Sequence, residues 1–337
     1  MSDMVRMTLE QVHETATSAC RALGCSAEQA SAIAETVTAA ERDECKSHGL
    51  FRIPFYARVI RSGAPVPDAV PVLEDRAPAV VRVDGGYGFA PLALKVGAEP
   101  LAQRARSQGI AALAVNNVFN ISALWPEVER LTEQGLVAFA FTAAISYVAP
   151  AGGSRPLYGT NPMAFGWPRQ GHPPVVFDQA SSVAARGEIQ IHQRDGKPIP
   201  EGWAIGPDGN PTTDPARALE GAQLPFGGHK GAAIALMVEL LAGALIGDLF
   251  SYEAGERDTA GTGAPQGGEF MIAIDPARCA GGGVGAPFEH AERLFERILE
   301  QEGTRLPSQR RYQARERTAK EGIEIPRSLY DEIVSYA

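Results

Sequence analysis

His48 and Arg52 are residues whose types and spacing suggest chemistry, since they lie four residues apart and Ser47 precedes the histidine. The second expected helix ends just before His48, so the helix dipole should favour the imidazolium and raise the pKa of this side chain. Arg52 could hold a carboxylate through two hydrogen bonds. A proton donor beside a carboxylate anchor suits reduction of a 2-oxo or 2-imino acid. The alternative is a surface histidine without a catalytic task.

The run Gly227-Gly228-His229-Lys230-Gly231 opens a long apolar stretch that we expect to be helical. Free N–H groups and the positive end of the helix dipole meet at such a point, and Lys230 adds a charge. The glycines would let a ligand approach the backbone. A phosphate or pyrophosphate is therefore the expected ligand, and the alternative is a glycine turn with a solvated lysine.

Asp178 closes the apolar run 175–177 and precedes Ser181 and Ser182. A carboxylate at a strand end can orient a histidine and tune its charge, although it could equally cap the next turn. The two serines, with neighbouring N–H groups, could hold a phosphate.

A small basic cluster follows at His192, Arg194 and Lys197. It could neutralise the 2′-phosphate of a dinucleotide, or it could lie on a solvated hairpin. No His/Cys/Asp spacing is typical of a metal site, so we expect no metal.

Two helices are expected at the N-terminus, because Thr8 and Ser26 each begin a capping box with a glutamine three residues later. The first should end at Gly24 and the second at about Lys46. From Val80, short apolar runs broken by glycine and proline indicate strands. We expect strands at 80–88, 109–117, 135–144, 162–168, 174–180 and 270–275, helices at 91–108, 126–134 and 230–245, a polar hairpin at 188–200, and a partly helical tail from residue 305.

Composition excludes several classes of function. The chain has 337 residues, 45% of them hydrophobic, which is enough for a sizeable core. A net charge of -9 and a pI near 5.3 argue against nucleic-acid and anionic-membrane partners. The apolar stretch 231–247 is short and contains Glu239, which favours a buried helix over a membrane span. Four cysteines without a paired framework, and an N-terminus without an apolar signal segment, indicate a reduced, cytoplasmic setting.

The dinucleotide fingerprint Gly-x-Gly-x-x-Gly is absent after the early strands, where a Rossmann fold requires it. The nearest glycine run, 281–285, comes after the last expected strand with the wrong spacing. We interpret it as a loop, and the sequence disfavours a Rossmann dehydrogenase.

Taken together, the motifs resemble the malate/L-lactate dehydrogenase superfamily over nearly the whole chain. They are Asp43-x3-Ser47-His48-Gly49-x2-Arg52-x3-Tyr56, Gly159-Thr160-Asn161-Pro162, Val176-Phe177-Asp178-x-Ala180-Ser181-Ser182, Gly227-Gly228-His229-Lys230-Gly231 and Arg305-Leu306-Pro307. Within the superfamily, the runs 122–129 and 224–230 are most similar to the imine-reducing branch, the Δ1-piperideine-2-carboxylate/Δ1-pyrroline-2-carboxylate reductases.

This resemblance implies an α/β fold in which a non-Rossmann domain with a mostly antiparallel sheet binds NAD(P)H, plus a helical domain formed by the N- and C-terminal segments. The expected division is 1–76 with 304–337 for the helical domain carrying the histidine, 77–117 with 251–303 for an α/β domain, and 118–250 for the NADPH-binding domain. It also implies a homodimer and a preference for NADPH.

The matching positions imply roles for individual residues. His48 would donate the proton, and Ser47 and Asp178 would be the other catalytic residues. Arg52 and Thr160 would face the substrate carboxylate. The cofactor would be bound by Ser181, Ser182, His192, Arg194, Lys197, Gly228, His229, Lys230 and Arg305.

The chain departs from the family pattern at Asn120, where a pocket histidine is usual. An amide keeps hydrogen bonding but removes a titratable group from the substrate pocket. The expected activity is NADPH-dependent reduction of a cyclic 2-imino acid to an L-amino acid. The alternatives are a 2-hydroxy acid dehydrogenase of malate, lactate or ureidoglycolate type, and a nucleotide-binding homologue without catalysis.

Overall fold

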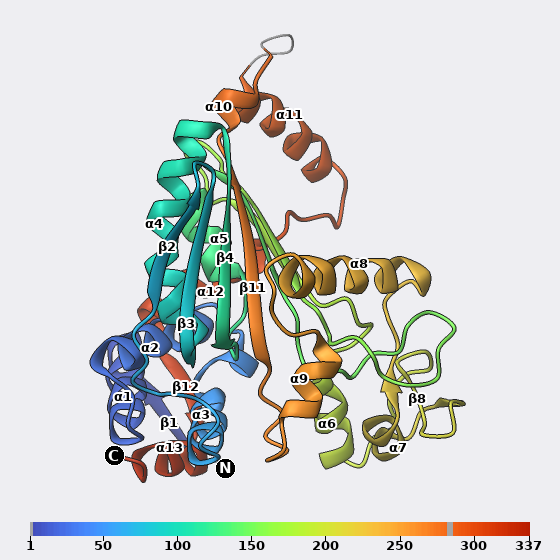
Figure 1. The fold of residues 1–337 in the computed structure, drawn as a ribbon. Helices are drawn as coiled ribbons and strands as arrows, with labels where there is room; N and C mark the ends of the chain where they lie inside the picture. The colour runs from blue at the N-terminus through green and yellow to red at the C-terminus, as the bar shows by residue number, and fades with distance from the viewer. Residues whose placement is uncertain (1–2, 282–285) are drawn as a thin grey trace. The chain divides into compact units, whose positions relative to one another are not determined.

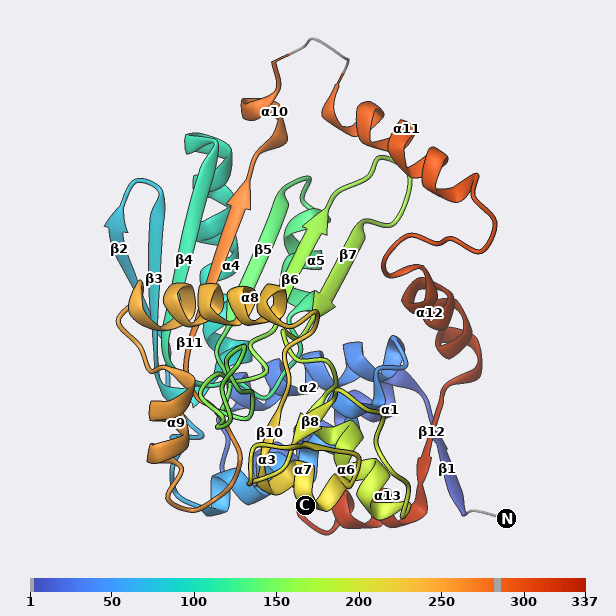
Figure 2. The same cartoon turned by 90° about the vertical axis from the view of Figure 1, so that its right-hand side faces the viewer.

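Short apolar runs build most of a seven-stranded sheet, whose strand order is β2-β3-β4-β11-β5-β6-β7. Buried and partly buried residues alternate along β3 and β6, whereas β4, β5 and β11 are buried almost throughout. The sheet is mainly antiparallel: β2 pairs antiparallel with β3, and β6 and β7 run in opposite directions in Figure 2, whereas β3 and β4 are parallel. All six expected strands are present. The bounds are β2 Val72–Ala77, β3 Val80–Phe89, β4 Ile110–Phe119, β5 Val137–Thr142, β6 Met163–Trp167, β7 Val175–Gln179 and β11 Gln266–Ile274.

This computed structural model describes residues 3–281 and 286–337, so four of the five residues of the glycine run 281–285 lie outside the described residues. The chain divides into two units. The first comprises residues 1–140, 164–177 and 271–337, and the second comprises 141–163 and 178–270. The finer three-part division expected from the sequence stays a prediction. Within the described ranges, no helix has the length and apolar character needed to cross a membrane.

The core of the first unit lies between the sheet and two helices, α4 (Ala90–Gln108) and α5 (Trp125–Thr132), on one of its faces (Figure 2). Leu101, Leu113 and Val128 are fully buried there. Both helices were expected, and α5 places Trp125 at its first position.

The N- and C-terminal segments fold together in the first unit (Figure 1). Strand β1 pairs antiparallel with β12, from Met4 opposite Pro326 to Met7 opposite Ile323. These segments contain β1 Met4–Met7, α1 Leu9–Ala22, α2 Ala27–Arg42, the 3-10 turns Lys46–His48 and Leu50–Arg52, α3 Ile53–Arg61, α12 Gln309–Glu321, β12 Ile323–Pro326 and α13 Arg327–Val334. Helices α10 Pro276–Cys279 and α11 Pro287–Leu299 lie at the opposite end of the large sheet (Figure 1). The charged tail is therefore partly helical, as expected.

Helix α2 ends earlier than the sequence suggested, at Arg42 instead of about Lys46. Asp43 caps the helix, and Glu44 has a positive φ of 56°, which breaks the helical path. His48 therefore lies on a separate 3-10 turn. Of the two capping boxes only the one at Thr8 is complete, since Gln29 is buried and donates to the carbonyl of Ala69.

The second unit contains a three-stranded sheet in the order β10-β8-β9 and four helices among its described residues. The hairpin expected at 188–200 is wrong, because residues 186–194 form helix α6. Ile189 is fully buried against Ile199, Ala204 and Ala218, whereas Ile191 is exposed. The elements are α6 Arg186–Arg194, β8 Ala204–Ile205, β9 Pro211–Thr212, α7 Pro215–Glu220, β10 Ala222–Gln223, α8 His229–Glu239, which a π turn at Leu240–Ala244 continues, and α9 Ser251–Arg257.

Candidate active site

His48 is partly buried and is held from two sides in the first unit. Its Nδ1 lies 3.1 Å from the hydroxyl oxygen of Ser47. Its ring stands at 87° to the indole of Trp125, with 6.2 Å between the ring centroids. Burial, followed by the positive charge of Arg52, lowers the pKa of His48 to about 3. The expectation of a raised pKa is wrong, since the histidine lies beyond α2 and its surroundings disfavour the charged form.

Glycine is required after His48 because the carboxyl group of Glu41 occupies the space a side chain would need. A Cβ at Gly49 would lie 2.1 Å from Glu41 Oε1. The same oxygen accepts a hydrogen bond of 2.7 Å from the N–H of Leu50. Burial raises the pKa of Glu41. This carboxyl group thus fixes the backbone that carries the histidine.

Arg52 presents a hydrogen-bond donor that the protein itself does not use. Its guanidinium lies 5.6 Å from the centroid of the Phe55 ring. Its Nε is buried and has no hydrogen-bond partner among the described residues. Burial lowers the pKa of this side chain. Because buried donors are almost always paired in folded proteins, this atom indicates a place for an anionic ligand.

Asn120 lies just beyond the end of β4 and is buried. Its side-chain oxygen accepts two hydrogen bonds of 3.1 Å, from the N–H and the hydroxyl of Ser122. The amide therefore shapes the turn that leads toward α5. Its predicted contact with substrate stays a prediction.

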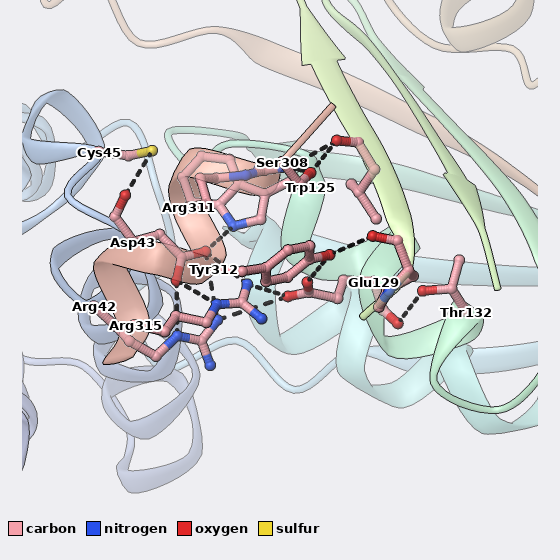
Figure 3. Close-up of polar contacts among 12 residues, drawn as sticks. Arg42, Asp43, Cys45, Trp125, Glu129, Thr132, Ser308, Arg311, Tyr312 and Arg315 are labelled. Carbon is pink, nitrogen blue, oxygen red and sulfur yellow. Dashed lines mark hydrogen bonds and ion pairs between the residues drawn. The ribbon is translucent and has the colours of Figure 1, made fainter. Parts of the chain in front are cut away.

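Sequence reasoning missed a buried polar network around Asp43, which Figure 3 shows. Trp125 connects this network to His48 through the contact between their rings. Asp43 accepts a hydrogen bond of 3.0 Å from the Nε1–H of Trp125 and two of 2.7 Å from Arg315. Arg315 also donates to Glu129 at 2.6 Å. Asp43 stands in the family motif quoted above, but nothing in the sequence links it to an arginine 272 residues away.

Thr160 is placed in the second unit by its neighbour Asn161, which is fully buried. The Asn161 amide donates to Glu239 at 2.8 Å, and its oxygen accepts from the hydroxyl of Ser251 at 3.0 Å. This network also explains Glu239, the lone carboxylate of an apolar helix. The carbonyl of Thr160 accepts both the N–H and the hydroxyl of Ser181, at 2.7 and 2.9 Å.

The glycine run at the start of α8 has the backbone shape expected for a ligand cradle. Gly227 and Gly228 have φ values of 55° and 62°, which favour glycine. A Cβ at Gly231 would lie 2.4 Å from the carbonyl oxygen of Phe226. His229 and Lys230 begin the helix with exposed side chains. A phosphate-bearing group fits this arrangement of an open helix start and two basic side chains.

Ser181 and Ser182 lie alongside the segment that leads into this run. The carbonyl of Ser181 accepts the N–H of Phe226 at 3.0 Å, and Ser182 forms a bridge with Pro225. Both hydroxyls donate to backbone carbonyls, that of Ser182 to Ala184 at 2.8 Å. Their predicted contact with phosphate therefore depends on hydroxyl oxygens acting as acceptors, or on backbone N–H groups.

The basic cluster belongs to α6 and the turn after it. His192 donates from Nδ1 to the carbonyl of Pro198 at 2.8 Å and packs edge-on against Trp203. Arg194 and Lys197 are exposed and share the carboxylate of Asp195, at 2.8 and 3.8 Å. The cluster thus retains positive charge but is partly neutralised.

Two predicted residues have placements that leave their roles open. Asp178 is partly buried near the end of β7, at the start of a segment of the second unit. Arg305 is exposed in the first unit, just before the buried Leu306. The pairing of His48 with Asp178 and the contact of Arg305 with the cofactor stay predictions.

A mainly antiparallel sheet, a partly buried histidine beside an arginine with an unused donor, and a basic helix start are consistent with an oxidoreductase outside the Rossmann class. A sequence model of the malate/L-lactate dehydrogenase family matches residues 7–334. The chain belongs to this family.

Individual members of the family, and one solved structure, are similar to this chain over almost its whole length. The chain is 53% identical over 332 residues to the Δ1-pyrroline-2-carboxylate/Δ1-piperideine-2-carboxylate reductase of Pseudomonas aeruginosa, covering 98% of this chain and 99% of that protein. It is 43% identical, over 100% and 99% of the two chains, to the (2R)-3-sulfolactate dehydrogenase (NADP(+)) of Chromohalobacter salexigens. The crystal structure of Δ1-piperideine-2-carboxylate reductase from Pseudomonas syringae pathovar tomato superposes with a TM-score of 0.94 at 41% identity, covering 99% and 100% of the chains.

Proposed function

We propose that this protein reduces a cyclic 2-imino acid, Δ1-pyrroline-2-carboxylate or Δ1-piperideine-2-carboxylate, to L-proline or L-pipecolate with NADPH. The observation that carries the proposal is the buried, unpartnered Nε of Arg52 four residues from His48, in a chain 53% identical to a reductase named for these substrates. We propose further that it works as a homodimer in the cytoplasm.

The residues divide the reaction between binding and proton transfer. NADPH supplies the hydride that C2 of the substrate receives. Arg52 holds the substrate carboxylate, with Thr160 as its second contact, and this fixes the position of C2. His48 donates a proton to the ring nitrogen, and Ser47 fixes the imidazole through Nδ1. Asp178 is proposed as the charge partner of the histidine.

Substrate binding itself should prepare His48 for this task. Without substrate, burial and the charge of Arg52 hold the pKa of His48 at about 3, so the imidazole is neutral near pH 7. A carboxylate bound to Arg52 offsets that positive charge and adds a negative one nearby. Both changes favour the imidazolium, so the pKa of His48 rises when the substrate is bound.

The cofactor is proposed to lie on the second unit. Gly228, His229 and Lys230 would hold a phosphate group at the start of α8, with Ser181 and Ser182 beside it. Three other basic side chains, Arg194, Lys197 and His192, would read the 2′-phosphate, and Arg305 would complete the site.

Lys230→Ala is expected to raise the Kd for NADPH about tenfold, or ~1.4 kcal/mol, because it removes one exposed cation from the phosphate cradle. Fluorescence titration with NADPH and NADH measures this directly. Lys95→Ala removes an exposed lysine that is paired with Glu35 and serves as the control. An unchanged Kd in Lys230→Ala would contradict a phosphate site at the start of α8.

Arg194→Ala should weaken binding of NADPH more than binding of NADH. Equal losses of affinity for the two cofactors would remove Arg194 from the 2′-phosphate site.

The activity is tested by following absorbance at 340 nm with a panel of cyclic imines and 2-oxo acids, each with NADPH and with NADH. Turnover of the imines supports the proposal. Turnover of oxo acids alone would make the protein a 2-hydroxy acid dehydrogenase, the class to which its sulfolactate relative belongs by name. Tight NADPH binding without any turnover would indicate a non-catalytic homologue.

Asn120→His is expected to add a second ionisation to the pH–rate profile and to change the ranking of substrates. A histidine can carry charge beside the substrate, whereas the amide exchanges only hydrogen bonds. The parent enzyme should show one ionisation, assigned to the coupled His48–Asp178 pair. Steady-state kinetics on the imine and oxo-acid panels decide the matter: an unchanged ranking with an unchanged profile makes Asn120 a residue of the Ser122 turn alone.

A further inference from the structure

Asp43 is a fully enclosed carboxylate on which three helices of the first unit converge. It follows α2, accepts the indole N–H of Trp125 at the start of α5, and accepts both arms of the Arg315 guanidinium from α12. Arg42 adds a hydrogen bond of 2.8 Å. Burial alone would raise the pKa of Asp43, but the hydrogen bonds from Arg315 and Arg42 outweigh it and lower the pKa. The acceptor is therefore permanently charged at neutral pH.

Trp125 is held by its edge and by its face (Figure 3). Its Nε1–H donates to Asp43, and the guanidinium of Arg311 lies 5.0 Å from the ring centroid. Arg311 is itself anchored by a hydrogen bond of 2.9 Å to the carbonyl of Val176. The indole is only 4% exposed. A side chain fixed in this way offers a rigid surface to whatever packs against it.

His48 packs against that surface. Its imidazole stands perpendicular to the indole, and its hydrogen-bond contact in the described structure is Nδ1 with Ser47. The serine constrains one nitrogen, and the indole constrains the plane of the ring. Together the two contacts fix the direction in which Nε2 points.

We propose that Asp43 and Trp125 are positioning residues for His48: the carboxylate fixes the indole, and the indole sets the plane of the imidazole that donates the proton. The inference rests on the proposed function. Arg315 extends the arrangement to α12, because its guanidinium binds both Asp43 and Glu129 of α5. Helix α12, which follows residue 305, thereby controls the geometry of His48 in the N-terminal part of the chain.

The test compares Trp125→Phe with Trp167→Phe. The first removes an indole whose N–H is bonded to Asp43, whereas the buried N–H of Trp167 has no partner among the described residues. Trp125→Phe should lower kcat about tenfold, within the range expected for a small misplacement of a reacting group. The Kd for NADPH should not change, and the solvent isotope effect on kcat should rise because proton transfer becomes slower. Trp167→Phe should leave all three quantities unchanged.

A second variant and an NMR titration test the positioning role independently of Trp125→Phe kinetics. Arg315→Lys leaves Trp125 in place but loses the two-pronged hold on Asp43, so kcat should fall in the same direction by a smaller factor. Titration of the His48 imidazole by NMR needs no turnover, and Trp125→Phe should raise its pKa by admitting water. If the parent reduces oxo acids instead of imines, the proposed function fails and the same comparison is made on those substrates. A parent-like kcat, isotope effect and titration in Trp125→Phe would overturn the positioning role.

Discussion

His48→Ala is expected to lower kcat for imine reduction by about 10²–10⁴, the usual effect of removing a general acid. The ring nitrogen of the substrate must gain a proton as C2 gains the hydride. His48 is a titratable side chain close to Arg52, and the two residues lie on adjoining 3-10 turns. The Kd for NADPH should change little, because all of the proposed cofactor residues except Arg305 belong to the other unit.

Single-turnover measurements at pH 6 to 9, with NADPH binding measured separately by fluorescence, check this expectation. His290→Ala, which removes an exposed histidine from α11, is the matched control and should behave as the parent. If His48→Ala keeps near-parent turnover over the whole pH range, the proton reaches the substrate by another route and the catalytic role assigned to His48 is wrong.

Six of the seven strands of the large sheet, all except β2, and the long helices could be predicted because local sequence dictates them. The run from Val80 alternates buried and partly buried residues along β3, and the apolar stretch after Lys230 forms α8. Helix α6 was missed because Ile189 and Ile191 suggested a strand. Only tertiary packing shows that one of these two isoleucines is buried and the other exposed.

Local backbone features of the candidate site were predictable, but its electrostatics were not. Local backbone rules were enough to predict that the glycine run at 227–231 begins a helix, and in the structure it lies at the start of α8. The pKa of His48 depends on burial and on Arg52, neither of which a helix-end argument contains. Asp43, Trp125 and Arg315 come from distant parts of the sequence, so no spacing pattern could associate them.

Arg52→Gln is expected to lower kcat/KM for the imine by about 10²–10³, equivalent to ~3–4 kcal/mol, because the substrate carboxylate loses a buried charged partner. The Nε of Arg52 is already desolvated and unpaired in the folded protein. Substrate binding therefore gives this N–H a hydrogen-bond partner. No further free energy is needed to remove the group from water, because folding has already buried it. Arg52→Lys should recover only part of the loss, since an ammonium cannot form the two-pronged contact.

The same substitution should raise the pKa of His48 in the free protein, because it removes one of the two causes that hold it near 3. The lowered pKa of His48 also makes the free energy of unfolding depend on pH. The pKa of His48 in the folded protein is below its ordinary value of 6.5, so the unfolded chain takes up the proton first as the pH falls. The stability that neutral His48 contributes is complete above about pH 6.5 and is lost toward pH 3. In Arg52→Gln this loss should be smaller, which denaturant unfolding at several pH values measures.

Arg58→Gln is the control that separates charge from position. Arg58 lies on α3 with its guanidinium 4.7 Å from the centroid of the Phe55 ring, the ring that Arg52 also contacts, but its side chain is exposed. Removing it should leave kcat/KM and the titration of His48 at the parent values, because water screens an exposed charge. If Arg52→Gln loses activity no more than Arg58→Gln does, the substrate carboxylate is held elsewhere. If activity falls but the pKa of His48 does not rise, Arg52 binds substrate without tuning the proton donor.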